Sequence, residues 1–492
     1  MNFYRRREFV RLAGMAGAWL QQPQGFRQDA GQRPPNIIFI MADDLGYGDL
    51  GCYGQTKIRT PHIDALAAEG LRFTDAYSGC TVCAPSRSVL MTGLHMGHTS
   101  VRCNPGGVPL LPGDVTVGEV LKRARYATGC FGKWALGPIG TAGVPWKHGF
   151  DEFFGYLHQV HAHSYYPEFL YTNDREYPLK GNTEGKRITY SHDVIANRTL
   201  DFIRRRRKEP FFCYVPFTIP HRELLVPEDS LAEYKGRFPE DVPVAERQYY
   251  GDQPAPRATL AAMITRMDRD VGRIVVLLKE LNLDRDTLLF FTSDNGSPEP
   301  AHGNEFFASN GPLRGHKRNF YEGGIRIPAI ARWPGRIRAG TVSRMPWYFC
   351  DVLPTVAELA RLRPPNGLDG ISIVPELLGA KAAGREQARH QFMYWELPVF
   401  ESGRFREEIP RQAVRMGQWK AVRPEPGGRL ELYNLEDDIG ETRDLAAERP
   451  RVMARIEEYL RTARTEPRPQ ELHKWPDRQQ VVVGGACERP SL

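Results

Sequence analysis

From Pro35 onward, short runs of β-branched and aromatic residues alternate with helical patterns of apolar positions. This alternation is typical of a sheet that is covered by helices. Continuous apolar runs predict buried strands at residues 36–41, 126–131, 211–217 and 287–292. Helical spacing and start signals predict helices that begin at Thr60-Pro61 and that cover residues 119–125, 191–208 and 259–283. The chain is therefore predicted to adopt an α/β fold.

The pattern changes near residues 362–390, where a Pro-Pro-Asn-Gly sequence and a charged stretch rich in Ala and Gly interrupt it. Strand-like segments and one helical segment follow at residues 392–395, 412–422, 430–434 and 450–464. This order predicts a small antiparallel sheet with one helix. We divide the chain into a larger domain (34–375), a C-terminal subdomain (376–475) and a loosely attached tail (476–492).

Residues 1–33 form a separate element at the N-terminus. They hold six arginines against two acidic residues, whereas the whole chain has 66 Lys and Arg against 59 Asp and Glu. Arg6 and Arg7 precede a short apolar run at residues 12–20, which is the layout of a bacterial twin-arginine export signal. We expect a periplasmic or secreted protein with no stable membrane anchor, because the run is too short to span a bilayer. The near-neutral remainder argues against a nucleic-acid partner.

Polar side chains follow directly after the four predicted strands: Asp43 and Asp44, Lys133, His221, and Asp294 with Asn295. In open α/β sheets, ligands bind beyond the carboxyl ends of the strands. Three carboxylates and an amide oxygen gathered there would repel one another unless a cation held them together. All-oxygen ligation selects a hard divalent cation, so we expect Ca²⁺, with Mg²⁺ as the alternative. Each pair taken alone is better explained as turn residues, and it is the presence of both pairs at strand ends that favours a cation.

The eight cysteines show no paired C-x-x-C spacing of the kind that indicates zinc. Cys80 and Cys83 form one C-x-x-C sequence, which is consistent with a redox pair or half of a metal site. A third interpretation is stronger, because residues 83–93 (CAPSRSVLMTG) match every defined position of C-x-P-S-R-x-x-x-[LM]-T-G. That sequence is the signature of the sulfatase family, in which the cysteine is converted to formylglycine.

Other segments resemble the same family and occur in its order between residues 36 and 435. They lie at residues 42–49, 132–134, 219–221, 293–296 and 313–328. The chain therefore resembles the formylglycine-dependent type I sulfatases, arylsulfatase-like members of the alkaline phosphatase superfamily. The resemblance implies a large, mixed, mostly parallel sheet sandwiched by helices, with residues 34–375 as the catalytic domain. It also implies a transient partner, the enzyme that installs formylglycine.

By this resemblance, residue 83 is an aldehyde that hydrates to a gem-diol. One hydroxyl attacks the sulfur of a sulfate ester and displaces the alcohol, and loss of a proton from the other hydroxyl expels sulfate. Arg87 positions the diol, Lys133 and Lys317 neutralise the sulfate oxygens, and His221 or Lys317 protonates the leaving oxygen. The implied metal ligands are Asp43, Asp44, Cys83, Asp294 and Asn295.

The chain departs from the family at Ala135, because the family commonly has His two residues after the lysine of its Gly-Lys-Trp sequence. We expect a substitute from the histidine-rich segment at residues 158–163 and select His161 as a residue that binds substrate. The alternative is that these histidines only pack against Tyr165 and Tyr166.

Export from the cytoplasm favours a sulfated carbohydrate as the substrate, and another sulfated small molecule remains open. Residues 394–396 and 404–415 are candidates for a sugar subsite, with Gln412 and Arg415 as the named candidates. Two other functions remain open: a phosphate or phosphonate monoester hydrolase of the same superfamily, and a catalytically impaired sulfate-binding homologue, which Ala135 would explain.

Overall fold

The computed structural model of this chain describes residues 33–221, 223–240, 253–298, 305–398, 400–401, 404–405, 409–473 and 475. The predicted export signal, apart from Arg33, and the predicted tail lie outside the described residues. Within these ranges, no helix is both long enough and apolar enough to cross a membrane.

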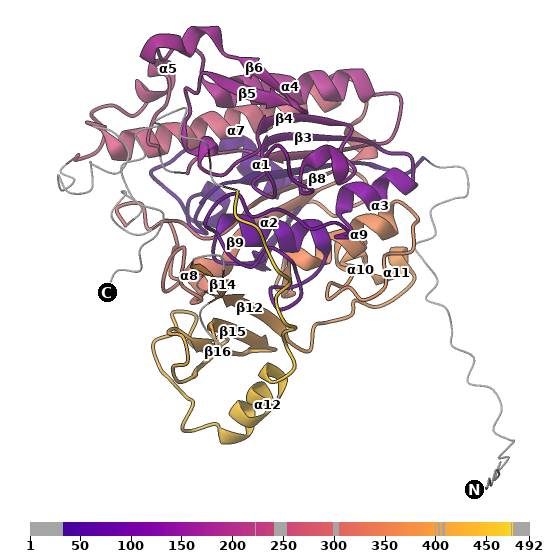
Figure 1. Cartoon of the computed structure of the whole chain (residues 1–492), viewed down its shortest axis with the longest axis vertical. Helices are drawn as coiled ribbons and strands as arrows, with labels where there is room; N and C mark the ends of the chain where they lie inside the picture. The colour runs from indigo at the N-terminus through magenta and orange to yellow at the C-terminus, as the bar shows by residue number, and fades with distance from the viewer. Residues whose placement is uncertain are drawn as a thin grey trace, which may run out of the picture.

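A large sheet of eleven strands forms the body of the molecule, in the order β10-β2-β9-β8-β1-β7-β3-β4-β5-β6, with β11 beside β2 (Figure 1). The strands β8, β1, β7, β3 and β4 are parallel, whereas β9 runs antiparallel to both β8 and β2. The predicted mixed, mostly parallel sheet is therefore confirmed. The strands are β1 (Asn36–Ala42), β2 (Leu71–Tyr77), β3 (Ala127–Lys133), β4 (Glu152–Tyr156), β5 (Phe169–Thr172), β6 (Arg175–Pro178), β7 (Phe211–Pro216), β8 (Thr287–Ser293), β9 (Arg326–Arg332), β10 (Thr341–Ser343) and β11 (Trp347–Tyr348).

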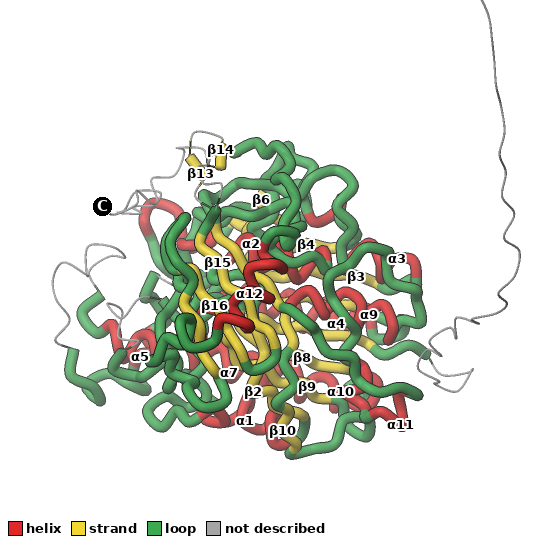
Figure 2. The backbone as a smooth tube through the Cα atoms, turned by 90° about the horizontal axis from the view of Figure 1, so that it is seen from below, coloured by secondary structure: helices red, strands yellow, loops and turns green. Residues whose placement is uncertain are grey.

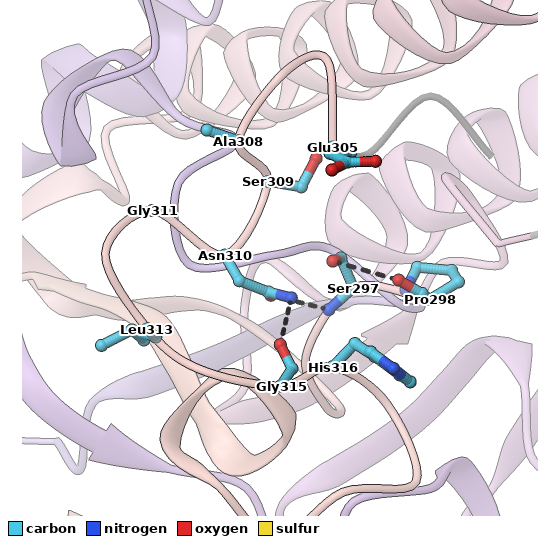
Figure 3. Close-up of a pocket in the computed structure, with 10 residues that line it drawn as sticks. All are labelled: Ser297, Pro298, Glu305, Ala308, Ser309, Asn310, Gly311, Leu313, Gly315 and His316. Atoms are coloured by element: carbon cyan, nitrogen blue, oxygen red, sulfur yellow. Dashed lines mark hydrogen bonds between the residues drawn. The ribbon is translucent and has the colours of Figure 1, made fainter. Parts of the chain in front are cut away.

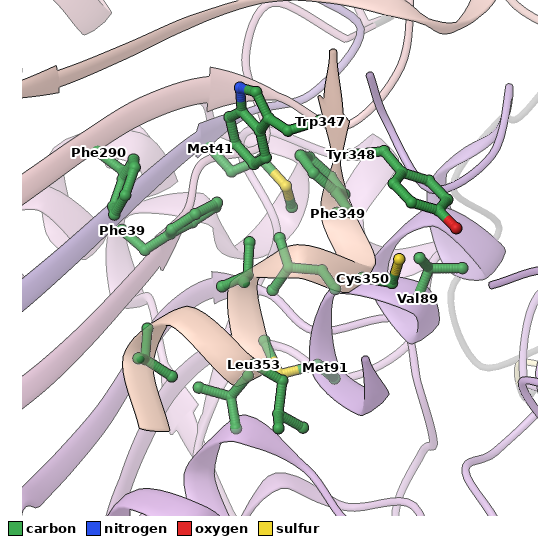
Figure 4. Packing of buried hydrophobic residues seen from close by; sticks show 14 of the residues in the cluster. Phe39, Met41, Val89, Met91, Phe290, Trp347, Tyr348, Phe349, Cys350 and Leu353 are labelled. Atoms are coloured by element: carbon green, nitrogen blue, oxygen red, sulfur yellow. The ribbon is translucent and has the colours of Figure 1, made fainter. Parts of the chain in front are cut away.

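Helices cover both faces of this sheet, because successive side chains of a strand point to opposite faces. Ile38 and Ile40 of β1 pack in one apolar core with α1 (Pro61–Ala68), α4 (Ser191–Arg206) and α7 (Pro256–Glu280). Phe39 and Met41 pack in the other core with α2 (Cys83–Thr92), α3 (Val117–Arg123) and α9 (Val352–Leu359). Figure 4 shows Phe39, Met41 and Leu353 of α9 as members of this second core, with Phe39 beside Phe290. Four shorter helices are α5 (Glu228–Leu231), α8 (Glu322–Ile325), α10 (Val374–Leu378) and α11 (Ala380–Ala383).

Local signals in the sequence set the starts of two helices, one at the predicted capping box and one three residues earlier than predicted. Thr116 caps α3, because its hydroxyl accepts the N–H of Glu119 at 3.3 Å and the Glu119 carboxylate accepts the N–H of Thr116 at 3.0 Å. The long helix α7 begins at Pro256 rather than at Thr259, with proline at its first position, where the missing N–H costs no hydrogen bond.

A second, antiparallel sheet follows, in the order β12-β15-β16-β17. Its strands are β12 (Met393–Leu397), β15 (Arg411–Met416), β16 (Trp419–Arg423) and β17 (Glu431–Asn434), and a separate two-stranded pair is β13 (Phe400–Glu401) and β14 (Arg404–Phe405). The helix α12 (Pro450–Leu460) packs on this sheet through Ile456, which lies in one apolar core with Val414 and Ala421. Figure 2 shows α12 lying across β15 and β16. The antiparallel sheet with one helix is confirmed, although residues 412–422 form parts of two strands rather than one.

The second sheet packs against the edge of the large sheet through buried polar contacts. Trp395 Nε1 donates to Ser78 O at 2.8 Å. Arg415 pairs with Asp75 at 3.0 Å, and Lys420 pairs with Glu322 at 2.8 Å. We call the buried charges at this contact the junction cluster: Asp75, Glu322, Glu441, Arg326, Arg415 and Lys420.

Of the segments suggested for a sugar subsite, residues 394–396, Gln412 and Arg415 do not line one, whereas residues 406–408 lie outside the described residues. The side chains of residues 394–396, Gln412 and Arg415 are all buried where the two sheets meet. Gln412 Nε2 donates to the hydroxyl of Tyr394 at 2.7 Å, and that hydroxyl donates to Glu396 at 2.7 Å. These polar groups satisfy one another inside the protein and leave no surface for a sugar.

Candidate active site

The polar residues after the parallel strands meet at one edge of the large sheet. β1 and β8 are in register, with Ala42 opposite Ser293, so Asp43 and Asp294 leave the sheet side by side. Asp44 has a φ of 65°, in the left-handed region, and its N–H donates to Asp294 Oδ1 at 3.1 Å. This turn holds the carboxylates of two distant segments together.

Cys83 is the first residue of α2, and it points into this group of carboxylates. Its Sγ lies 3.3 Å from Asp43 Oδ1 and 3.5 Å from Lys317 Nζ. Burial, together with the carboxylates of Asp294 and Asp43, raises the pKa of the Cys83 thiol well above its usual range. An unmodified Cys83 is therefore a protonated thiol, which is a poor nucleophile.

Arg87 lies one helical turn after Cys83 and is fully buried. Its Nη2 and Nε donate to Asp294 Oδ2 at 2.7 and 3.1 Å, and its Nη1 donates to the carbonyl oxygen of Lys133. Burial alone would lower the pKa of Arg87, but the carboxylates of Asp294 and Asp43 raise it, so the guanidinium stays charged. Arg87 thus fixes the start of α2 against the ends of β8 and β3.

Two lysines bring positive charge to the same point. Lys133 Nζ donates to Asp43 Oδ2 at 2.7 Å, and Lys317 Nζ donates to the Asp44 carboxylate at 2.8 Å. Burial opposes ionisation of Asp43, but the charges of Lys133, His221, Arg87 and Lys317 hold its pKa well below its usual range. Both lysines therefore stay paired with ionised carboxylates.

His221 follows β7 and faces the same group. Its Nε2 lies 3.3 Å from Lys317 Nζ and 3.4 Å from Asp44 Oδ2. Burial lowers the pKa of His221 to about 4. The ring is therefore a neutral imidazole within hydrogen-bond distance of a lysine.

The donor set is suited to a divalent cation. Ligand atoms of Asp43, Asp44, Cys83 and His221 all lie within 4.8 Å of one another. Asn295 donates through Nδ2 to Asp44 Oδ1 at 2.7 Å, while its Oδ1 is buried and has no hydrogen-bond partner among the described residues. A buried acceptor without a donor is costly in a native protein, and a cation would satisfy it.

His163 is a member of the site that the sequence did not reveal. Its ring stacks on His221 with centroids 4.6 Å apart and an interplanar angle of 10°. His161, the predicted residue, lies instead among aromatic rings, with Trp475 stacked on it at 4.6 Å. The histidine-rich segment was the only signal for His163 in the sequence, and it does not show which of its rings faces the active site.

The structure contains a second group of potential metal ligands, formed by His95, His98 and Asp369. This group is better explained as a set of structural hydrogen bonds. His95 Nδ1 accepts the N–H of Gly97 at 3.1 Å, so the ring carries its proton on Nε2, the atom that faces Asp369 at 3.6 Å. His98 Nδ1 donates to Asp369 at 2.9 Å. Metal ligation requires unprotonated nitrogens, and here both nitrogens that face the carboxylate carry protons.

A pocket of about 270 Å³ is lined by residues from the segments 297–298 and 305–316, which lie in sequence between Asn295 and Lys317 of the site. Its lining residues include Ser297, Asn310 and His316, and Figure 3 shows Asn310 bridging the loop. Asn310 Oδ1 accepts the N–H of Ser297 at 3.2 Å, and its Nδ2 donates to Gly315 O at 3.0 Å. Because Lys317 N donates to Ser297 O at 2.8 Å, the pocket wall is tied to the lysine of the site.

Comparison of this chain with known proteins identifies the family to which it belongs. The family model for sulfatases matches residues 35–362, and the model described as N-sulphoglucosamine sulphohydrolase, C-terminal, matches residues 315–466. The chain belongs to the sulfatase family. It is therefore a sulfuric ester hydrolase, as predicted from residues 83–93.

Relatives of this sulfatase support the same assignment. Arylsulfatase A of Homo sapiens is 36% identical over 421 residues, which cover 79% of this chain and 75% of that protein. N-acetylgalactosamine-6-sulfatase of Canis lupus familiaris is 33% identical over 418 residues, which cover 79% and 72%. The solved structure of Ps i-CgsB in complex with k-i-k-neocarrahexaose has a TM-score of 0.73 and 29% identity, and the match covers 88% of this chain and 94% of that one.

Proposed function

We propose that this sulfatase hydrolyses sulfate monoesters of carbohydrates, with residue 83 as formylglycine and a calcium ion held by Asp43, Asp44, Asp294, Asn295 and residue 83. One observation carries this proposal: the thiol of Cys83 is buried at 3.3 Å from a carboxylate and 3.5 Å from an ammonium group. Burial and the carboxylates of Asp294 and Asp43 raise the pKa of this thiol by more than the lysines lower it, so they suppress a thiolate. A group that reacts through oxygen does not need a thiolate, and the nearby ammonium group can bind an anionic ester.

Calcium is favoured because the ligands are hard oxygens from three carboxylates and one amide. The buried, unpartnered Asn295 Oδ1 supports a cation at this position. When bound, the ion would lower the pKa of a coordinated hydroxyl and neutralise charge on the sulfate group.

Formylglycine, once hydrated, supplies a hydroxyl nucleophile and a second hydroxyl whose deprotonation releases sulfate. Arg87, fixed by Asp294, orients residue 83 from one helical turn away. Lys133 and Lys317 bind the non-bridging sulfate oxygens, where their fixed positive charge stabilises the transition state. Lys317 Nζ can donate a proton or hydrogen bond to the leaving oxygen directly, whereas His221 Nε2, 3.3 Å away, can do so only in the tautomer or charge state that carries a proton on Nε2.

The carbohydrate substrate is supported by relatives whose names carry a sugar sulfate, such as the N-acetylgalactosamine-6-sulfatases. The other parts of the proposal follow from the sequence. A formylglycine-installing enzyme must act on residue 83, and the twin arginines Arg6 and Arg7 direct the folded protein to the periplasm.

The test compares hydrolysis of a sulfate ester and a phosphate ester of the same phenol by protein that carries formylglycine. We expect kcat/KM for the sulfate to exceed that for the phosphate by at least about tenfold. The Cys83→Ala variant, prepared in the same way, measures contaminating activity. Faster phosphate hydrolysis would favour the phosphate or phosphonate hydrolase, and wild-type rates equal to those of the variant would favour a silent sulfate-binding protein.

A further inference from the structure

After α12 the chain returns to the catalytic domain. Residues 465–473 and Trp475, which we call the C-terminal strap, run back along that domain, and Figure 1 shows this yellow segment rising from α12 past α2. Two hydrogen bonds and one ion pair hold it there. Thr465 N donates to Gly97 O at 3.0 Å, and Gln470 Nε2 donates to Ser100 O at 2.9 Å. Arg468 forms an ion pair with Asp114. The strap is thus fixed to the catalytic domain before it reaches the active-site side.

The strap ends on the histidine loop, residues 158–163. His158 Nδ1 accepts the N–H of Val160 at 3.1 Å, so the ring proton is on Nε2, which donates to His473 O at 3.2 Å. His473 N in turn donates to Gly107 O at 3.1 Å. A Cβ on Gly107 would lie 1.8 Å from His473 O, so this close approach requires glycine.

Trp475 completes the contact by stacking on His161, with ring centroids 4.6 Å apart and an interplanar angle of 21°. Phe169 and Tyr156 contact the same ring at centroid distances of 4.8 and 4.9 Å. Burial lowers the pKa of His161 to about 3. The ring is therefore neutral and packs as one layer of an aromatic cluster.

His161 and His163 belong to the same turn of 3-10 helix, η3 (His161–His163). With about three residues per turn, side chains two positions apart point in different directions. His161 contacts the strap, and His163 stacks on His221 in the active site. A single turn of 3-10 helix therefore links Trp475 to the catalytic group.

We propose that the C-terminal strap is a positioning element of the active site, in which Trp475 holds the histidine loop so that His163 presents its Nε2 to the substrate beside His221. This inference rests on the proposed sulfatase reaction. His163 Nε2 is buried without a hydrogen-bond partner among the described residues, so it can donate to or accept from a bound ester. Trp475 touches no reacting group and acts through His163.

A double-mutant cycle tests this link with an aryl sulfate as the substrate. We expect Trp475→Ala to lower kcat/KM about tenfold, less than the roughly 100-fold that a 1 Å misplacement can cause. His163→Ala should lower it further, and the double variant should equal His163→Ala, because coupled residues are not additive. Trp475→Phe keeps a stacking ring and should restore kcat/KM to within about twofold of wild type. Unchanged kcat/KM in Trp475→Ala, or a full additional loss in the His163→Ala background, would overturn the proposal.

Two further measurements separate positioning from general stability. Tyr459→Ala removes a ring that stacks on Phe392 at 4.2 Å within the C-terminal subdomain, and it should lower Tm without changing kcat/KM. Hydrogen exchange of a peptide covering residues 156–166 should be faster in Trp475→Ala than in wild type, and unchanged exchange would contradict the strap's role. Because hydrogen exchange does not depend on turnover, it tests whether the strap holds the histidine loop even if the wild-type enzyme proves inactive on sulfate esters.

Discussion

Two buried clusters in this sulfatase each combine three carboxylates with three cationic side chains. The active-site cluster contains Asp43, Asp44, Asp294, Arg87, Lys133 and Lys317. The junction cluster contains Asp75, Glu322, Glu441, Arg326, Arg415 and Lys420. Charge count therefore does not distinguish a catalytic site from a structural one in this molecule.

The clusters differ in what their geometry leaves unsatisfied. At the junction, Lys420 lies 2.8 Å from Glu322 and 2.9 Å from Glu441, and all three side chains have no solvent exposure. In the active site, Asn295 Oδ1 is buried with no hydrogen-bond partner among the residues that the structure describes, and no charged group is paired with it. Glu441 Oε1 at the junction also lacks a hydrogen bond, but it lies 2.9 Å from the Lys420 ammonium. A buried acceptor with no paired charge indicates a place for a ligand, whereas a cluster whose charges are all paired indicates a structural role.

The largest expected effect is the loss of activity on replacing Cys83 with alanine. Removing the nucleophile should lower sulfate release by on the order of 10⁴-fold or more. The free energy of unfolding should stay within about 1 kcal/mol of wild type, because the substitution removes only a small thiol. Ion chromatography of released sulfate and urea unfolding check both parts. A variant that unfolds readily would place Cys83 with the structural residues instead.

Metal removal should have the next largest effect. Dialysis against a calcium chelator should lower kcat about 1000-fold, since the ion supplies several kcal/mol of transition-state stabilisation. Calcium at about 100 times its Kd should restore activity and add about 2.7 kcal/mol to the free energy of unfolding. Full activity after verified removal of all divalent metal would contradict a metal centre at these residues.

At the junction, Lys420→Met should lower stability rather than turnover. The substitution leaves the Glu322 and Glu441 carboxylates buried without their shared cation, and breaking such a pair costs about 3–5 kcal/mol. The folded fraction should keep the wild-type kcat. Lys122→Met, at the exposed Lys122–Asp151 pair, serves as the control and should cost less than about 1 kcal/mol. Equal losses in the two variants would show that the junction cluster contributes no more than a surface pair.

The smallest predicted effect is a pH dependence of stability. Burial raises the pKa of Glu441 to about 7 in the folded protein, whereas an unfolded glutamate titrates near about 4.3. Between these values the folded state binds the extra proton, so the free energy of unfolding falls as pH rises, by at most about 1.4 kcal/mol per pH unit. Glu441→Gln cannot titrate and should show a shallower fall in urea unfolding between about pH 5 and 7. Parallel curves for the two proteins would contradict this assignment.

Much of the active site could be predicted because it depends on strand ends. Continuous apolar runs located β1, β3, β7 and β8, and the polar residues after them must lie at one edge of a parallel sheet. The structure brings Asp43, Asp294, Lys133 and His221 together there.

Features that depend on side-chain direction could not be predicted from the sequence. His161 and His163 are two residues apart, and only the 3-10 turn determines that His163 meets His221. Residues 412–422 were predicted as one strand-like segment, although Gly417, with a φ of 61°, makes the tight turn between β15 and β16. That Gly was an available signal for a hairpin.

The central claim is that residue 83 is formylglycine, and mass spectrometry of the peptide that spans residue 83 tests it most directly. The measurement requires protein purified from its native host, because a host without the installing enzyme would leave the thiol unchanged. We predict the mass of the aldehyde or its hydrate in place of the cysteine mass. A peptide that carries only unmodified cysteine would contradict the proposed mechanism.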